Sequence, residues 1–157
     1  MNEDLLSILG KIDENLIGRI ISSSERKLLT NNFDIKQFPA ELIEILSKYK
    51  IIGQIFSISD DRDPSGIGVE MKWFDPSDQI EEAYKCYPGR LVIKDDYLPI
   101  GMCLSGSGDP YFLKTIDQKY MVFRLPHDAI YEDNYDYDSA EFICLLHELF
   151  NNLSNLD

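Results

Sequence analysis

The apolar residues change their spacing near residue 51, and this change constrains the fold more than any other feature of the chain. Before it, apolar residues recur three and four positions apart, as on one face of an α-helix. After it, short runs of β-branched and aromatic residues alternate with polar ones, as in β-strands. Helices followed by strands are typical of an α+β domain, and the absence of strict strand–helix alternation disfavours a doubly wound dinucleotide fold.

The first fifty residues predict three helical segments. The first is marked by apolar residues at helical spacing, and glycines 10 and 18 are points where it could break. Ser23 or Ser24 is expected to cap a short turn over ERKLL, and Pro39 suits the first turn of a third helix because it lacks an N–H donor. The apolar residues concerned are Leu5, Leu9, Ile12, Leu16 and Ile20 in the first segment and Leu42, Ile43, Leu46 and Tyr49 in the third.

The later residues predict a mainly antiparallel sheet of about five to six strands with helices packed on one side. IIGQIFSI and GVEMKWF form the first expected pair, and four further strands are RLVI, YLPIGMCL, PYFLKTI and KYMVFRL. Asp117 and Gln118 provide the turn between the last two.

Two helices are expected within and after these strands. DPSDQIEEAYKCY should start at Asp75 or Ser77, carry Glu81 and Glu82 near its positive N-terminal end, and stop at Pro88 and Gly89. A closing helix is expected from Asp138 or Ser139. Its apolar face would comprise Phe142, Leu145, Leu146, Leu149, Phe150 and Leu153.

Length and cysteine usage predict one folded domain in a reducing compartment. A chain of 157 residues can bury a sizeable hydrophobic core, so we expect a single domain over 1–157. Residues 37–153 would form the main part of this domain, and residues 1–36 would form an N-terminal helical extension or subdomain. The three cysteines are odd in number and widely spaced, which favours the cytoplasm. The acidic N-terminus and the lack of a long apolar run disfavour secretion and membrane insertion.

The charge is strongly negative and unevenly distributed. The chain has 28 acidic and 15 basic residues, a formal net charge of −13, and residues 1–50 hold 8 of the acidic and 7 of the basic ones. Residues 51–157 therefore carry nearly all of the excess, which disfavours binding to nucleic acid or to anionic lipid. Two interpretations remain: a charge that serves solubility, or a negative face that steers a basic partner.

The glycine-rich run SGSGD, residues 105–109, raises the question of a catalytic or phosphate site. A phosphate loop needs a following helix and usually a lysine, whereas Asp109 and Pro110 lead into a strand, so a loop between strands is favoured. A triad of Ser105 or Ser107 with His127 and Asp128 lacks the G-x-S-x-G elbow. We expect no catalytic residue and no cofactor. We also expect no bound metal, because the histidines lack the spacing of zinc ligands and the aspartate runs lack the ordered ligands of an EF-hand.

Two acidic loops remain as candidate partner-binding segments. Tyrosine offers contact area at a low entropic cost, and carboxylates match lysine and arginine on a partner. The other interpretation is a solvated loop whose tyrosines cover the nearby core. The candidate residues are Asp60, Asp61 and Asp63 in SDDRDPSG, and Tyr131, Glu132, Asp133, Tyr135, Asp136, Tyr137 and Asp138 in EDNYDYD and the residue before it.

The order of the motifs resembles the SUKH superfamily of Smi/Knr-type domains over roughly residues 37–153. The resemblance is carried by FPAELIEILSKY, IIGQIFSIS, GVEMKWF, CYPG, YLPIG, GSGDPYFL, the strand ending in RLPHD, and SAEFICLLHELF. The chain departs from the family where an asparagine-glycine-glycine element often follows the proline-led helix, since Lys50 to Gly53 stand there. Residues 1–36 match no motif.

The resemblance implies an α+β fold without a catalytic centre that binds protein. Bacterial members are commonly immunity proteins that neutralise toxin domains, many of them nucleases, and a related fungal regulator acts in cell-wall signalling. The charge, the loop composition and this resemblance favour the hypothesis of an immunity protein that binds a basic toxin through its acidic surface. A second hypothesis is a regulatory or scaffold module that binds a cellular protein. A third, a small hydrolase or nucleotide-binding enzyme, rests only on the Gly-Ser turn and His127.

Overall fold

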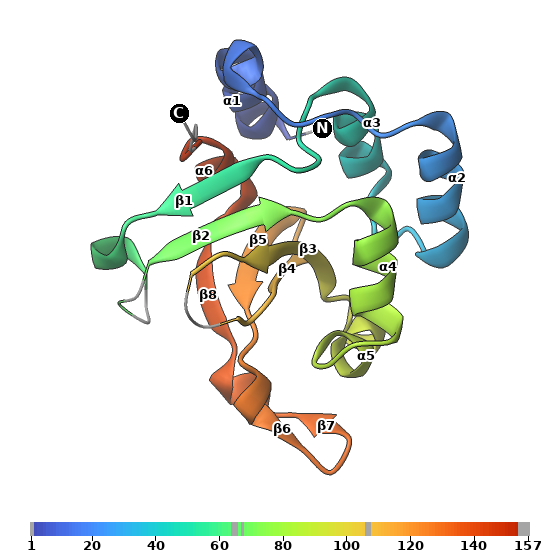
Figure 1. Cartoon of the computed structure of the whole chain (residues 1–157), viewed down its shortest axis with the longest axis vertical. Coiled ribbons are helices and arrows are strands. Elements are labelled where there is room, and N and C mark those ends of the chain that lie inside the picture. The colour runs from blue at the N-terminus through green and yellow to red at the C-terminus, as the bar shows by residue number, and fades with distance from the viewer. Residues whose placement is uncertain (1, 64–65, 67, 106–107, 154–157) are drawn as a thin grey trace.

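The computed structural model shows an α+β fold around a curled six-stranded antiparallel sheet (Figure 1). It describes residues 2–63, 66, 68–105 and 108–153. The strand order is β1-β2-β3-β4-β5-β8, and each neighbouring pair is antiparallel. The strands are β1 (Ile55–Ile58), β2 (Val69–Trp73), β3 (Leu98–Cys103), β4 (Tyr111–Ile116), β5 (Lys119–Arg124) and β8 (Glu141–Leu145). The predicted α+β class and the mainly antiparallel sheet are confirmed.

Most of the predicted strands form where alternation placed them. β1 and β2 pair with Phe56 opposite Met71, as expected for the first two runs. β4 and β5 are joined by Asp117 and Gln118, which have φ values of 51° and 65°. Positive φ at both central residues matches the right-handed twist of the strands, so this predicted turn is confirmed.

The two faces of the sheet bury different clusters. On β4, Tyr111 and Leu113 belong to the main core, whereas Phe112 belongs to a second, smaller one. Side chains that alternate along a strand point to opposite faces, so the sheet is covered on both sides at this point. The main core packs against the helices α1, α3 and α6, and the smaller core packs against α5 and the segment around Tyr135.

The N-terminal helices are α1 (Glu3–Ile12), α2 (Ser23–Asn32) and α3 (Ala40–Lys48). Ser22, one residue before the expected cap, forms a capping box with Glu25 at the start of α2. Pro39 is the N-cap of α3, directly before the first turn where it was expected. α1 supplies Leu5 and Leu9 to the main core, so the N-terminal extension shares the core of the remaining chain.

The predicted first helix ends earlier than its apolar spacing suggested. Gly10 lies inside α1, a 3-10 turn follows at Asp13–Asn15, and the chain then runs extended. Arg19 and Ile52 exchange backbone hydrogen bonds of 2.9 and 3.0 Å. A Cβ on Gly18 would lie 2.4 Å from the Ile52 carbonyl oxygen, so glycine permits this close approach. Ile20 is consequently exposed and does not join the expected apolar stripe.

Helix α4 (Pro76–Tyr84) forms at the predicted place, but it is shorter than the predicted segment. Asp75 is its N-cap residue, and Glu81 and Glu82 lie in its last turn, so their expected position near the positive end was wrong. RLVI was also wrong as a strand: α5 (Gly89–Val92) and a 3-10 turn (Ile93–Asp95) occupy it. Val92 packs into the smaller core and Ile93 into the main one.

The expected closing helix is divided into a strand and a short helix. Residues Glu141–Leu145 form β8 and pair with β5, and only Leu146–Phe150 form α6. Leu146, Leu149 and Phe150 are buried as expected, whereas Phe142 lies on the other face of the sheet and is exposed. Strand pairing with β5 therefore overrides the helical spacing of this segment.

Short elements connect the main ones. They are three 3-10 turns, η2 (Asp60–Arg62), η4 (His127–Ala129) and η5 (Tyr137–Ser139), and a small hairpin of β6 (Ile130–Tyr131) and β7 (Asn134–Tyr135). The hairpin projects from the end of the molecule opposite α1 (Figure 1). Within the described part of the chain, no helix has the length and apolar character needed to cross a bilayer.

Candidate protein-binding site

The first acidic segment, Asp60 to Asp63, divides into an exposed and a buried part. Asp60 and Asp61 lie in η2 and are exposed to solvent. The Asp63 side chain is 0% exposed and accepts hydrogen bonds of 2.9 and 3.2 Å from Arg124 Nη2. Asp63 is therefore unavailable to a partner, and this part of the prediction is wrong because an internal cation holds the carboxylate inside.

Arg124 is the centre of a buried polar network. Its guanidinium also donates to Glu141 Oε2 at 2.7 Å and to the Tyr111 hydroxyl at 3.4 Å. Burial opposes the charge on Arg124, but the hydrogen bonds to Asp63 and Glu141 outweigh it, so the pKa of the guanidinium is raised. The network ties the loop after β1 to β5 and β8, which gives it a structural role.

The second acidic segment forms a structured projection that we call the acidic hairpin, residues 130–138. Ile130 pairs with Tyr135, and Tyr131 pairs with Asn134. The two-residue turn consists of Glu132 and Asp133, with φ values of 47° and 63°. Tyr131, Glu132 and Asp133 are exposed, and Tyr131 retains 56% of its full accessibility. The tip therefore presents two carboxylates beside one aromatic ring.

The base of the acidic hairpin is held by its other two tyrosines. Tyr135 is buried, and its hydroxyl donates a 2.9 Å hydrogen bond to the Pro126 carbonyl. Tyr137 stacks on Tyr97 with ring centroids 5.4 Å apart, and its hydroxyl donates to Asp95. Burial raises the pKa of both phenols, and the bond to Asp95 adds to the rise at Tyr137. Tyr135 thus covers the core, as the alternative interpretation expected.

Asp136 and Asp138 have different roles although they are two residues apart. Asp136 is the N-cap of η5, and its carboxylate accepts bonds from Asp138 N at 3.1 Å and Ser139 Oγ at 3.2 Å. Asp138 is exposed. The exposed members of the predicted set are therefore Tyr131, Glu132, Asp133, Tyr137 and Asp138 here, with Asp60 and Asp61 in the first segment.

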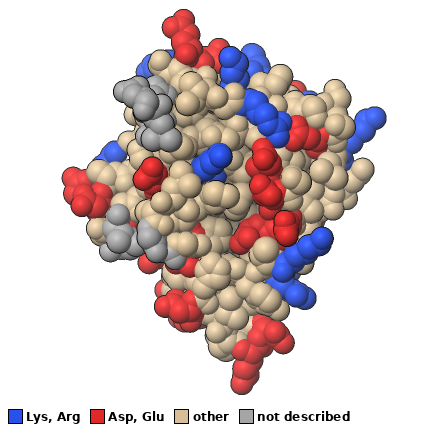
Figure 2. Space-filling model, viewed as in Figure 1, with Lys and Arg blue, Asp and Glu red and all other residues tan. Residues whose placement is uncertain are grey.

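The surface of the acidic hairpin has one sign of charge. Residues 127–138 contain five carboxylates and no lysine or arginine. Figure 2 shows acidic side chains at the projecting end of the molecule, where Figure 1 places this hairpin. Like charges on a projecting element produce a negative potential that extends about 8 Å into physiological salt. A positively charged surface is attracted to such an element.

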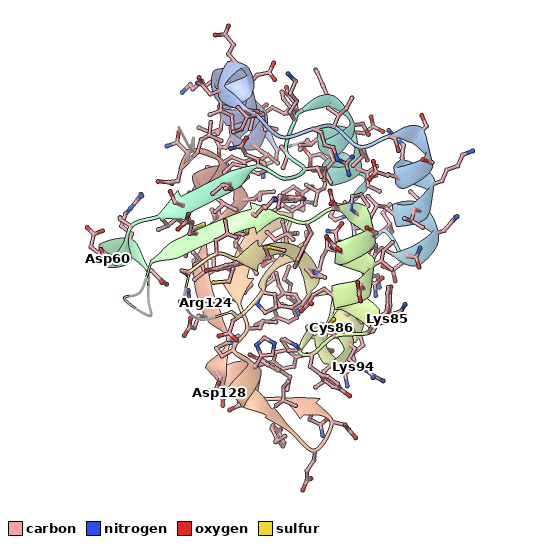
Figure 3. The ribbon with its side chains drawn as sticks, viewed as in Figure 1. Asp60, Lys85, Cys86, Lys94, Arg124 and Asp128 are labelled. Carbon is pink, nitrogen blue, oxygen red and sulfur yellow. The ribbon has the colours of Figure 1, made fainter. Side chains whose placement is uncertain are left out.

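The structure does not bring the two acidic segments together. Figure 3 places Asp60 beyond the end of β1 and Asp128 beside the start of the acidic hairpin, with Arg124 between them. One residue missing from the predicted set is Asp95, which binds Tyr137 from the turn before β3. The sequence signal that could locate this turn is the acidic pair in KDDY, residues 94–97, but only the tertiary fold places the turn against EDNYDYD.

The serine and histidine of the enzymatic hypothesis lie in other arrangements. His127 Nδ1 lies 2.5 Å from Asp109 Oδ1, and this carboxylate also accepts a 3.0 Å bond from His127 N. Asp109 thus contacts the imidazole of His127, whereas the triad hypothesis assigns this role to Asp128. Ser105 Oγ lies 3.1 Å from Cys103 Sγ. The described residues of the SGSGD run, Ser105, Gly108 and Asp109, lie between β3 and β4, as predicted for a loop that joins two strands, and Gly106 and Ser107 lie outside the described residues.

Among the residues that the structure describes, no three His, Cys, Asp or Glu side chains converge as ligands for a metal ion. Comparison of the chain with protein-family models, with curated proteins and with solved structures gives no match.

Proposed function

We propose that this chain is a non-enzymatic protein-binding module of the cytoplasm, which acts as an immunity protein by binding a basic toxin domain. The observation that carries the proposal is the acidic hairpin: its exposed carboxylates and Tyr131 stand on a base fixed by Tyr135 and Tyr137. A fixed base lowers the entropy lost when a partner binds. The motif order that resembles SUKH domains supports the same function.

The electrostatics support a basic partner over a neutral one. Opposite charges at the rim of an interface accelerate association and select against partners of the wrong charge. A nuclease domain suits this surface because its own substrate channel is positively charged. Occupation of that channel by Glu132 and Asp133 would exclude nucleic acid, which gives a direct route to inhibition without any chemistry by the bound protein.

Calorimetry with the protein encoded by the neighbouring gene tests the proposal. We expect saturable binding whose affinity falls as salt rises from 50 to 500 mM, on the order of tenfold or more. A variant with Glu132→Gln, Asp133→Asn and Asp138→Asn should bind more weakly and with a smaller salt dependence. Absence of heat, or binding indifferent to both salt and these substitutions, contradicts the proposal.

A further inference from the structure

An open cavity of about 360 Å³ lies beside the base of the acidic hairpin. We call it the Glu82 pocket. It is bounded by the end of α4, the loop that follows α4, the segment after β2, the strand β3, the residues just before β4, and η4. Its lining residues include Phe74, Glu82, Cys86, Tyr87, Met102 and His127.

The carboxyl group of this pocket is poorly compensated. Glu82 lies in the last turn of α4, where the helix dipole is negative and disfavours a carboxylate. Burial raises the pKa of Glu82, while a hydrogen bond from the Cys86 thiol and the charge on His127 oppose the rise. Among the described residues, no lysine or arginine forms a salt bridge with Glu82. A cation placed in the pocket would stabilise this group.

The walls of the pocket suit a flat cation better than a round one. Phe74 and Tyr87 contribute aromatic surface, and Met102 contributes a thioether. Tyr87 already contacts a guanidinium, because Cζ of Arg90 lies 5.1 Å from its ring centroid. Guanidinium groups stack on aromatic faces and bind carboxylates through two parallel hydrogen bonds, which an ammonium group cannot do.

Hydrogen bonds connect the acidic hairpin to η4, which lines the Glu82 pocket. His127 lines the pocket, and the hairpin begins three residues later. The Tyr135 hydroxyl bonds to Pro126 O, and Asp136 N bonds to Ala129 O at 3.0 Å, so both sides of η4 are fixed to the hairpin. In Figure 3, Cys86 and Asp128 lie at the same end of the molecule. One partner can therefore contact both features.

We propose that the Glu82 pocket receives an arginine side chain of the basic protein partner. The inference rests on the proposed function, since it names the anchor of the same interface. The acidic hairpin attracts the partner, and the pocket supplies a concave site where one desolvated side chain contributes much of the affinity, as anchors at interface centres do. The guanidinium pairs with Glu82 and lies against Tyr87 or Phe74.

A capped amino acid tests the pocket without the partner. We expect N-acetyl-arginine methylamide, added in an NMR titration, to bind with a dissociation constant on the order of millimolar and to shift the resonances of Cys86, Tyr87 and His127. Capped citrulline has nearly the same shape and no charge, and it should bind at least about fivefold more weakly. Equal binding of the two probes, or shifts confined to other surfaces, overturns the proposal.

Glu82→Gln and its neighbour Glu81→Gln form a matched pair of variants. Glu82→Gln should lower the affinity for the full partner by about tenfold, whereas the exposed Glu81→Gln should leave it nearly unchanged. Both variants keep the size of the side chain, and their amide spectra confirm the fold. If Glu82→Gln binds the partner with full affinity and the salt dependence is retained, the proposal of an arginine in the pocket is overturned, whereas the proposed interface at the acidic hairpin is not. Capped arginine that binds without any effect of Glu82→Gln on the partner identifies a small-molecule site and also overturns it.

Discussion

The two acidic segments are both rich in carboxylates, but the fold holds them in different ways. Residues 60–63 include Asp63, which turns inward to a buried cation, whereas residues 130–138 turn most of their carboxylates outward from a base of tyrosines. The difference lies in what the rest of the fold supplies: Arg124 stands beside the first segment, and Tyr97 and Asp95 stand beside the second. The composition of a segment therefore predicts that it is charged, but it does not predict whether its carboxylates face solvent or the interior of the protein.

Arg124→Met should have the largest effect, because it leaves Asp63 buried without its cation. Breaking a buried ion pair in this way destabilises proteins by about 3 to 5 kcal/mol. Urea denaturation followed by circular dichroism measures the free energy of unfolding. The exposed Arg90→Met makes the same chemical change at the surface and should cost less than about 0.5 kcal/mol. Equal losses in the two variants would show that the first segment is not held by its ion pair.

Neutralising the acidic hairpin should affect binding and leave stability unchanged. The triple variant Glu132→Gln, Asp133→Asn, Asp138→Asn is expected to lose roughly tenfold in partner affinity, about 1.4 kcal/mol, mainly through slower association. Its free energy of unfolding should change by less than about 0.5 kcal/mol, because all three side chains are exposed. Stopped-flow association rates and denaturation curves separate the two quantities. A large loss of stability would make this segment resemble the first.

Tyr135→Phe tests the base of the acidic hairpin. The substitution keeps the ring but leaves the Pro126 carbonyl without its hydrogen-bond donor, which should cost about 1 kcal/mol. Amide hydrogen exchange at residues 130–136 should accelerate while the sheet stays protected. Tyr131→Phe, at the exposed tip, is the matched control and should change neither quantity. Unchanged exchange in Tyr135→Phe would mean that the hairpin is held by other contacts.

Removing an exposed ion pair should have the smallest effect on stability, and this effect can be compared with that of removing the buried pair. The hydrogen bond from Arg19 is the main cause that lowers the pKa of Glu25 from 4.5 to about 2. A carboxyl whose pKa is lower in the folded state stabilises the fold above pH 4.5, and this contribution is lost as pH falls toward 2.

Glu25→Gln should therefore flatten the pH dependence of stability between about pH 4.5 and 2, by less than about 1 kcal/mol because Arg19 is half exposed to solvent. Thermal unfolding across this range measures the pH dependence, with Glu14→Gln as the control at another exposed carboxylate. An effect as large as that of Arg124→Met would remove the distinction between exposed and buried pairs.

Local patterns predicted most of the fold. Alternation located β1 to β5, and the proline and serine signals located the starts of α2 and α3 to within one or two residues. The errors fall where tertiary contacts decide. The residues RLVI suit a strand by composition, yet Val92 and Ile93 serve different cores, and Gly89 lets α5 approach α4 so closely that a Cβ would lie 1.9 Å from Glu82 O.

The candidate site was predictable in its charge and less so in its geometry. The sequence marks EDNYDYD as a candidate binding segment, but the burial of Tyr135 depends on Pro126 and Ala129, and the position of Tyr137 depends on Asp95. The same limit applies to EFICLLHELF, whose spacing fits a helix and a strand alike. Its first half is a strand because β5 offers an unpaired edge, and no local signal states which edge is open.

The end of the described chain has a consequence for self-association. Leu153 forms an antiparallel bridge with Phe56, and Ser57 N donates to Asn152 O at 3.0 Å. These two residues occupy backbone groups of β1 that would otherwise template the strand of a neighbouring molecule. Truncation after Phe150 would uncover that row, so the shortened protein should aggregate at concentrations where the intact chain stays dispersed.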